Sequence, residues 1–402
     1  MKLTIFRSTI RGEGGSSLER SLALADRITS LLRSEPHLSR MEVAQGIELS
    51  PATVGRAVQN LIDAGSLTER VQASRTTGRP RMELRLNPRF AYALVADIAV
   101  ESAVLGLVDY AGRLIFRKVL AQGMQDLRLA VDGLSKALAA VLQDLPPVAS
   151  RLAGVGIAVT GTWNTAQHAL VFTPNLPQWN GVDLTALFRS LPTARLVIDN
   201  DTKAATLGEM TVGAARRLRN FLYVRASDFG IGSALVSNRT IVRGEDNMAG
   251  GIGHSLVSSD AGLPRCRCGR RGCLESLASL AVIEQQLAAG GDKAAVLQQS
   301  VDYLAPAIAN LTNLFAPEAV VLGGTLFKTY PELYPALVQA SRERVLSHIV
   351  HRFTFVPAEF EPHSALMGMA MEVFAHSPHH LGALMESAAG PVETPAVEEV
   401  ER

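Results

Sequence analysis

Four residues that can bind a metal ion lie between positions 254 and 273, and three of them fall within a short stretch that contains two glycines. Cys266, Cys268 and Cys273 are the only cysteines of the chain, and His254 lies upstream of them. Three thiolates and one imidazole form a closed tetrahedral shell for structural zinc, and the intervening glycines allow the backbone to bend. The alternative is unrelated buried thiols or a disulfide, but an odd cysteine number without a secretion signal argues against a disulfide framework. We therefore predict a zinc site with these four ligands.

The wider motif carries a family resemblance. It reads Gly250-Gly-Ile-Gly-His254, followed by Cys266-Arg-Cys-Gly-Arg-Arg-Gly-Cys-Leu-Glu275. This pattern resembles the zinc signature of the ROK family, which contains sugar kinases and sugar-responsive repressors. The resemblance implies an α/β fold in which a two-lobed, actin-like (ribonuclease-H-type) domain holds a sugar between its lobes.

The resemblance also implies a set of sugar-binding residues. Asn200 and Asp201 match the pair in which the kinases use the aspartate as general base for a sugar hydroxyl. Glu275 matches a sugar-binding glutamate, Asn175 begins a segment leading into the sugar-facing wall, and His254 is next to the pocket. An aspartate that accepts from a hydroxyl can hold a sugar when no phosphate is transferred. The alternative for Asn200, Asp201 and Glu275 is ordinary turn and helix-cap chemistry.

One position departs from the family's sugar site. Members usually have Ala-Gly-Glu-Ile-Gly-His, whereas this chain has Ala249-Gly-Gly251-Ile-Gly-His254. Gly251 removes a carboxylate that would bind one or two hydroxyls. The resemblance therefore implies a sugar specificity that differs from that of the glucose-type members, or an acetylated, phosphorylated or weakly held ligand.

The two loops that hold phosphate in the kinases are altered. Where the kinases have Asp-x-Gly-x-Thr, this chain has Asp97-Ile-Ala99-Val-Glu101, and where they have Gly-Thr-Gly-Ile-Gly it has Asp228-Phe229-Gly-Ile-Gly. Close approach of backbone to phosphate needs glycine, and added carboxylates repel the ligand. We expect no ATP binding and no enzymatic activity.

The first ninety residues differ in charge from the remainder. They hold fourteen lysines and arginines against nine acidic residues, which leaves twenty-five against twenty-nine in the rest of the chain. Residues 70–89 alone contain six arginines and one acid. A basic segment of this kind is typical of contacts to a phosphate backbone.

The same segment predicts a helix-turn-helix. Helices are expected over Leu18–Arg33, from a cap at Ser39 to Gly46, and from a cap at Ser50 to Gly65. Two strands, Leu67–Val71 and Met82–Leu86, are expected to flank a basic tip, or wing. The arrangement resembles the winged helix of ROK repressors, including Gly-Arg-Pro in the tip and Leu-Asn-Pro after the second strand.

The third helix has a polar side of the residue types that read base edges in a major groove. The expected DNA-binding residues are Ser50, Thr53, Arg56, Gln59 and Asn60 on this helix, with Arg75, Arg79 and Arg81 on the wing. A three-helix bundle with an ordinary charged surface is the alternative, but the basic wing favours DNA binding.

The rest of the chain alternates short strands with helices. The expected divisions are a disordered N-terminus (1–17), a winged helix-turn-helix (18–88), a first lobe (89–194, with a returning helix at 363–376), a second lobe with the zinc motif (195–362) and a disordered tail (377–402). No apolar run is long enough to span a bilayer, and no signal-peptide pattern is visible, so we expect a cytoplasmic protein.

Together these features predict a DNA-binding regulator, most simply a repressor of carbohydrate uptake or catabolism genes. Double-stranded operator DNA, a sugar or sugar-derivative effector and a second copy of the chain, in a dimer or tetramer, are the expected partners. Effector binding is expected to change lobe closure and the spacing of the two reading heads. Two alternatives stay open: an active sugar kinase with an appended DNA-binding domain, and a regulator controlled by a partner protein.

Overall fold

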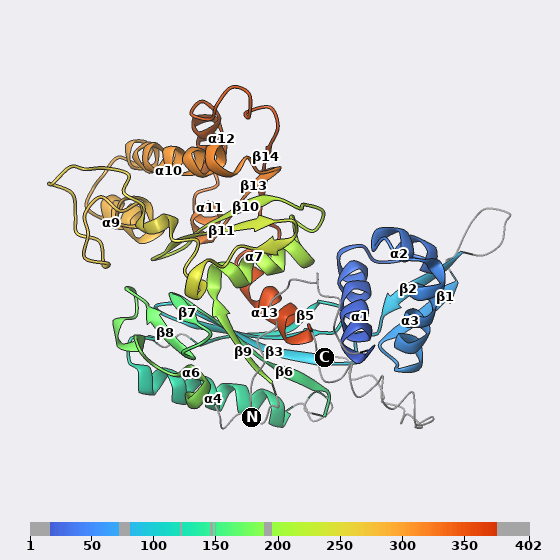
Figure 1. Ribbon diagram of the computed structural model, residues 1–402. Helices are drawn as coiled ribbons and strands as arrows, with labels where there is room; N and C mark the ends of the chain where they lie inside the picture. Colours follow the sequence, from blue (N-terminus) through green and yellow to red (C-terminus); the bar gives the residue numbers. More distant parts are fainter. Residues whose placement is uncertain are drawn as a thin grey trace. The chain divides into compact units, whose positions relative to one another are not determined.

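The computed structural model of the protein describes residues 17–71, 81–120, 123–144, 148, 150–188 and 195–375. These residues fall into two compact units that meet in the sequence between Ala91 and Tyr92 (Figure 1). The expected boundary at residue 88 lies three positions earlier. Arg75, Arg79 and the segments expected to be disordered at the two ends lie outside the described residues, apart from Ser17.

The described residues of the N-terminal unit form three helices and one hairpin (Figure 1). Its elements are α1 (Ser17–Ser34), α2 (Arg40–Gly46), α3 (Pro51–Asp63), β1 (Leu67–Val71) and β2 (Met82–Leu86). The two strands pair antiparallel, with Leu67 opposite Leu86 and Val71 opposite Met82. The strand bounds coincide with those expected from the sequence.

Capping and apolar spacing explain where these helices begin and how they pack. The side chain of Ser39 accepts from the backbone of Glu42, and the Glu42 carboxylate accepts from the backbone of Ser39, which makes a capping box. The Ser50 hydroxyl accepts from the Thr53 amide, and proline occupies the first helical position of α3. The helices and hairpin share one core, formed by apolar residues that include Ile28, Val43, Val54, Val58, Leu61, Leu67 and Leu84.

The second unit contains two five-stranded sheets. The first has the order β5-β4-β3-β6-β9 and the second β12-β11-β10-β13-β14. The strands of the first are β3 (Tyr92–Ile98), β4 (Ala103–Asp109), β5 (Leu114–Leu120), β6 (Leu152–Val159) and β9 (Leu196–Asn200). Those of the second are β10 (Phe221–Ala226), β11 (Ile231–Ser237), β12 (Thr240–Ile241), β13 (Ala319–Gly323) and β14 (Thr354–Pro357). A small hairpin, β7 (Thr162–Asn164) with β8 (Ala169–Phe172), lies beside the first sheet.

Helices cover these sheets (Figure 1). On the first sheet, α4 (Leu127–Asp144) shares an apolar core with β3, β4 and β6, and α13 (Ser364–Phe374) covers the opposite face. On the second sheet, the core includes residues of α8 (Glu275–Ala278), α9 (Leu280–Ala288), α10 (Lys293–Phe315), α11 (Thr325–Thr329) and α12 (Leu333–Arg342). Two further helices, α6 (Leu184–Leu187) and α7 (Asp201–Thr211), complete the set described. None of the described helices has the length and apolar character needed to cross a membrane.

The position of β9 corrects one expectation. The second lobe was expected to begin at residue 195, but Leu196–Asn200 pairs parallel with β6 and forms the edge of the first sheet. A short run of consecutive aliphatic residues, Leu196-Val-Ile198, predicts a strand without specifying the sheet that it joins. The expectation for the C-terminal helix agrees with the structure, because α13 packs on β3 and β6.

Glycines allow α7 to approach α13 closely, and this contact positions the start of α7. A Cβ atom on Gly368 would overlap the carbonyl oxygen of Ala204, and one on Gly208 would overlap that of Ser364. Backbone contact at this distance is possible only without side chains. Asn200 caps the helix, and its carboxamide oxygen accepts from the amides of Thr202 and Lys203. Asp201 is thereby fixed at the end of β9.

Candidate functional site

The four predicted metal ligands converge in the structure. The donor atoms of His254, Cys266, Cys268 and Cys273 all lie within 4.8 Å of one another. The Cys266 sulfur lies 3.7 Å from the His254 Nδ1 atom, and the Cys268 and Cys273 sulfurs are 3.6 Å apart. Burial raises the pKa of the Cys266 thiol to about 12, so a bound cation is needed to hold the thiolate at neutral pH. Burial, reinforced by Arg270, lowers the pKa of His254 and favours the neutral imidazole that binds metals.

Turns between the ligands make this convergence possible. The Gly269 amide donates to the Cys266 carbonyl, and the Cys266 amide donates to the Arg270 carbonyl. Leu256 and Cys273 form an isolated β-bridge, which brings the segment after His254 beside the last cysteine. Gly269 and Gly272 both have positive φ, a conformation that favours glycine. The donor set and its spacing fit a tetrahedral zinc ion.

All five predicted sugar-binding residues line one cleft of about 360 Å³. They come from four segments of the second unit: Asn175, the consecutive pair Asn200 and Asp201, His254, and Glu275. The altered phosphate loops contribute to the same cleft through residues that include Asp97, Ala99, Glu101, Asp228 and Phe229. The structure therefore places the predicted sugar-binding residues and the altered phosphate loops around the same cleft.

At one end of this cleft, the contacts of Glu275 join it to the metal segment. Its Oε2 atom accepts from the Ile231 amide at 3.1 Å, and the Asn175 side chain donates to Oε1 at 3.5 Å. Arg267, which lies between two of the cysteines, donates to the Asn175 carboxamide oxygen at 2.8 Å. Burial raises the pKa of Glu275 to about 7. A sugar hydroxyl entering here would meet a carboxyl group that is already oriented.

Gly251 lines the cleft beside these residues. A Cβ atom built on it would meet no other atom within 4 Å, and the residue has a negative φ. The backbone and the space would therefore accept a larger side chain. The absence of the family's carboxylate at this position leaves room in the cleft that a ligand can use.

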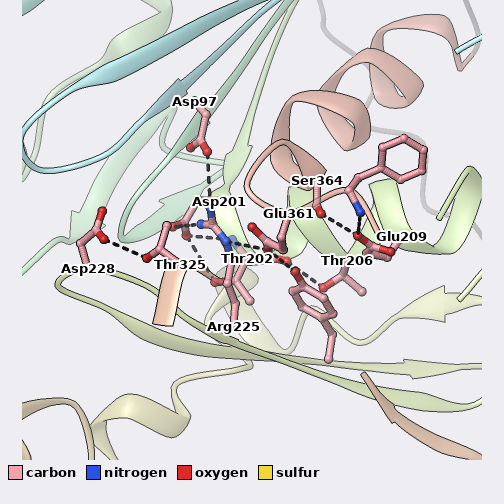
Figure 2. A network of polar contacts seen from close by, with 12 residues as sticks. Asp97, Asp201, Thr202, Thr206, Glu209, Arg225, Asp228, Thr325, Glu361 and Ser364 are labelled. Carbon is pink, nitrogen blue, oxygen red and sulfur yellow. Dashed lines mark hydrogen bonds and ion pairs between the residues drawn. The ribbon is translucent and has the colours of Figure 1, made fainter. Parts of the chain in front are cut away.

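At the other end, Arg225 binds three acidic residues, and we call these four residues the Arg225 network (Figure 2). Its guanidinium nitrogens lie 2.9 Å from Asp201, 3.3 Å from Glu361 and 3.5 Å from Asp97. Burial alone would lower the pKa of Arg225, but Glu361, Asp97 and Asp201 raise it above its usual value. Burial raises the pKa of Asp97 to about 7, and the nearby Asp201 and Glu361 oppose the effect of Arg225.

Arg225 and Glu361 were not among the site residues predicted from the sequence. Arg225 lies in the otherwise apolar strand Phe221–Ala226, and a charged residue in a buried strand is a usable signal of a functional or paired group. Glu361 precedes α13 and has no comparable signal in the sequence. It also accepts a hydrogen bond from the Tyr223 hydroxyl.

Contacts on α7 hold the segment that carries Glu361 (Figure 2). Both carboxylate oxygens of Glu209 are used: one accepts from the Phe360 amide and the Ser364 hydroxyl, and the other from the Glu359 amide. The segment before α13 is thus tied to the helix that begins with Asp201. This arrangement fixes Glu361 relative to Arg225.

In the N-terminal unit, the predicted DNA-binding residues on α3 share one accessible side. Arg56, Gln59, Asn60 and Ser50 are exposed and Thr53 is half-buried, whereas Val54, Val58 and Leu61 face the core. Gln59 is already engaged, since its oxygen accepts from Arg40 at 3.1 Å and its nitrogen donates to Asp63 at 2.8 Å. Ser50 bonds Thr53 through both hydroxyls at 2.8 Å.

Arg81, the one predicted wing arginine among the described residues, forms an ion pair with Glu42 of α2. It is held beside the capping box at the start of that helix. The side-chain hydrogen bonds of Gln59, Ser50 and Thr53 do not involve Arg56 and Asn60, the two other predicted base-reading residues of α3.

The sequence model of the ROK family matches residues 97–375. This chain belongs to the ROK family. The match begins at Asp97 in the first altered phosphate loop and ends beyond α13, so this ROK chain carries the N-terminal unit in addition to the family domain.

Relatives of this ROK chain include named repressors. The xylose repressor of Bacillus subtilis (strain 168) is 25% identical over 366 residues, covering 87% of this chain and 94% of the relative. The DNA-binding transcriptional dual regulator NagC of Escherichia coli (strain K12) is 23% identical, covering 83% and 88% of the two chains.

A solved structure has a similar fold. A ROK family transcriptional regulator, described as a homologue of the E. coli Mlc protein, superimposes with a TM-score of 0.72 at 23% identity. The similarity covers 93% of this chain and the whole of the other. The α/β architecture predicted from the sequence is that of the family.

Proposed function

We propose that this ROK protein is a DNA-binding transcriptional repressor of carbohydrate uptake or catabolism genes, and that a sugar or sugar derivative modulates its affinity for DNA. The observation that carries the proposal is the extent of the similarity to named repressors. The xylose repressor alignment covers 87% of the chain, more than the residues from 97 onward can supply. It therefore extends into the N-terminal unit, as a match to the ROK domain alone would not.

The N-terminal unit is the proposed DNA-reading part, a winged helix-turn-helix. Three helices followed by an antiparallel hairpin support this assignment, and α3 is the proposed recognition helix. Thr53, Arg56 and Asn60 are proposed to read bases, and Ser50 to bind DNA near the start of α3. Gln59 must exchange its bonds to Arg40 and Asp63 before it can contact DNA. The wing arginines Arg75, Arg79 and Arg81 are proposed to contact the sugar-phosphate backbone or minor groove.

The cleft of the ROK unit is the proposed effector site. Asn175, Asn200, Asp201, His254 and Glu275 are its proposed ligand-binding residues, supported by their shared position in one cleft. Asp201 is not arranged as a general base for catalysis. One of its oxygens accepts from the Thr202 amide and from Asn200, and the other accepts from Arg225. We propose that the protein is not an enzyme.

The metal centre is proposed to be structural. His254, Cys266, Cys268 and Cys273 would hold a zinc ion that orders the segment between η3 (Ile252–His254) and α8. Zinc bound there would fix His254 and, through the short link to Glu275, the adjoining wall of the cleft. The chain itself supplies the hydrogen bonds that orient Glu275 and Asn175.

The proposed repressor acts as a homodimer or tetramer on a pseudo-palindromic operator, because symmetric oligomers read symmetric sites. Access to DNA implies a cytoplasmic location for this activity. An effector changes the occupancy of DNA only as far as its affinities for the two states differ, and tenfold release needs about 1.4 kcal/mol of coupling.

Fluorescence anisotropy tests the DNA half of this proposal. The full chain would be titrated onto labelled duplexes from its own upstream region and onto scrambled duplexes of equal length, at several salt concentrations. We expect preference for the upstream duplex of about a thousandfold or more, with both affinities falling as salt rises. Equal affinity for both duplexes at every salt concentration would contradict sequence-specific repression.

A further inference from the structure

We propose that the effector of this protein is an uncharged sugar and that the cleft discriminates against phosphate esters of that sugar. The inference rests on the proposed function and specifies its ligand class. It concerns the end of the cleft lined by Asp97, Glu101, Asp201, Arg225 and Asp228, which we call the Arg225 end.

The guanidinium at this end is already paired with carboxylates. Arg225 contacts Asp97, Asp201 and Glu361, and each of its three nitrogens has a carboxylate partner (Figure 2). A phosphate at Arg225 would compete with these three carboxylates, of which Asp97 is buried, for the same cation. A buried carboxylate without a partner is costly, so the exchange disfavours the phosphate.

The other cations among the described cleft residues are also committed. Lys203 is buried and donates to the Asn247 carbonyl at 2.8 Å, and burial lowers its pKa. Arg270 donates to the His254 carbonyl at 2.9 Å, beside the metal centre. Neither side chain supplies a free positive charge at the Arg225 end.

Three backbone amides in or beside the two altered loops donate to internal partners. The Ala99 amide donates to the Ser102 carbonyl at 3.0 Å, and the Ser227 amide donates to the Gly230 carbonyl at 2.8 Å. The Ile231 amide donates to Glu275 at 3.1 Å. Loops that bind phosphate present several free amides to it, and these three are used within the protein.

Two carboxylates add repulsion at this end. Glu101 and Asp228 are both exposed and line the cleft. Asp228 accepts from the Thr325 hydroxyl at 2.8 Å (Figure 2), so that hydroxyl is not free to donate to a ligand phosphate. The negative charges of a phosphate ester would face these carboxylates across the cleft.

An uncharged sugar carries no negative charge for these carboxylates to repel. Its hydroxyls are donors, and Asp201 Oδ2 and both carboxylate oxygens of Glu275 accept only one hydrogen bond each in the contacts given above, which leaves a lone pair on each for a hydroxyl. The space beside Gly251 admits a ring substituent without a clash. The same groups that disfavour a phosphate therefore suit a neutral polyol.

Isothermal titration calorimetry on the full chain tests this inference. The ligands would be matched pairs, each a sugar and its phosphate ester: glucose and glucose 6-phosphate, N-acetylglucosamine and its 6-phosphate, and galactose and its 1-phosphate, with xylose and mannose added. We expect at least one uncharged sugar to bind, and its ester to bind about tenfold or more weakly. An ester that binds as tightly as, or more tightly than, its parent sugar would overturn the inference and leave an effector-binding repressor intact.

A charge-neutralised variant supplies a second, independent result. Glu101→Gln with Asp228→Asn keeps the size of both side chains and an acceptor for Thr325 while it removes two negative charges. The ratio of ester to sugar dissociation constants should fall severalfold in this variant. The matched control, Glu284→Gln with Asp302→Asn on α9 and α10, changes the net charge equally at exposed positions. An equal fall in the control would overturn the local explanation.

The calorimetry separates a failure of the proposed effector binding from a failure of the inference that the effector is uncharged. Absence of binding by every sugar and every ester would overturn the effector half of the proposed function, and this inference with it. Binding by esters alone would overturn only the inference.

Discussion

Asp97 is a buried carboxyl group that shares one guanidinium with two other acids. Its neighbours Asp201 and Glu361 add negative charge, and burial raises its pKa to about 7 from the usual 3.8. A carboxyl whose pKa is higher in the folded state stabilises the fold at pH values below its unfolded pKa. That contribution is lost as the pH rises from about 4 through 7, because ionising the buried group then costs free energy.

Replacing Asp97 with asparagine should reduce this pH dependence. The amide keeps an oxygen beside Arg225 but cannot ionise, so the midpoint of thermal unfolding should fall less between pH 5 and pH 8 than it does in the parent chain. Differential scanning fluorimetry across that range measures the effect, with Asp302→Asn as the exposed control. A slope equal to that of the parent would contradict the assigned titration of Asp97.

Cys268 is the second residue whose role can be isolated. Replacing it with serine removes one of the four converging donors, so zinc content should fall from about one ion per chain to well below one, with a drop of several degrees in unfolding temperature. Inductively coupled plasma mass spectrometry on the purified chain measures the metal. Ser259→Ala, in the same segment, is the control. Full zinc content in the cysteine variant would show that the ligand set is wrong.

At the scale of elements, the N-terminal helices and strands were predictable because local signals define them. Serine caps at Ser39 and Ser50, a proline at the first helical position and glycine after α3 all act within a few residues. The cluster of candidate metal ligands was predictable for a related reason, because three of the four lie within one short segment.

Elements whose partners are distant in sequence could not be predicted in the same way. Arg225 and Glu361 are separated by 136 positions, and no local pattern relates them. The assignment of β9 to the second lobe was wrong because the residues of β9 do not reveal which strand it pairs with. In the structure that strand is β6 of the first sheet. Arg267, which bonds Asn175, was likewise seen only as part of the cysteine motif.

The third helix yields a prediction at its own scale. Changing Arg56 to alanine should weaken binding to the specific duplex by about tenfold to a hundredfold, since a bidentate base contact is worth about 1–3 kcal/mol. Non-specific binding should weaken less. Anisotropy titrations on the two duplexes measure both losses, and Lys136→Ala on α4 removes the same charge from the ROK unit as a control. Equal losses on both duplexes would argue that Arg56 contacts phosphate only.

At the scale of the whole molecule, one chain combines a candidate DNA-binding surface with a candidate sugar-binding cleft. One unit carries a helix with an exposed polar side, and the other holds a cleft with acceptors for hydroxyls and an arginine paired with three carboxylates. Arg225 engages Asp201, and three amides in or beside the altered loops bond internally.

The most direct measurement is an electrophoretic mobility shift on the protein's own upstream region, with and without a panel of sugars and amino sugars. The account predicts a shifted complex that one uncharged sugar releases, with at least a tenfold rise in the protein concentration needed for half-maximal binding. A complex that no sugar alters would contradict the effector half and favour control by a partner protein. Absence of any complex, together with ATP-dependent phosphorylation of a sugar, would contradict the account as a whole.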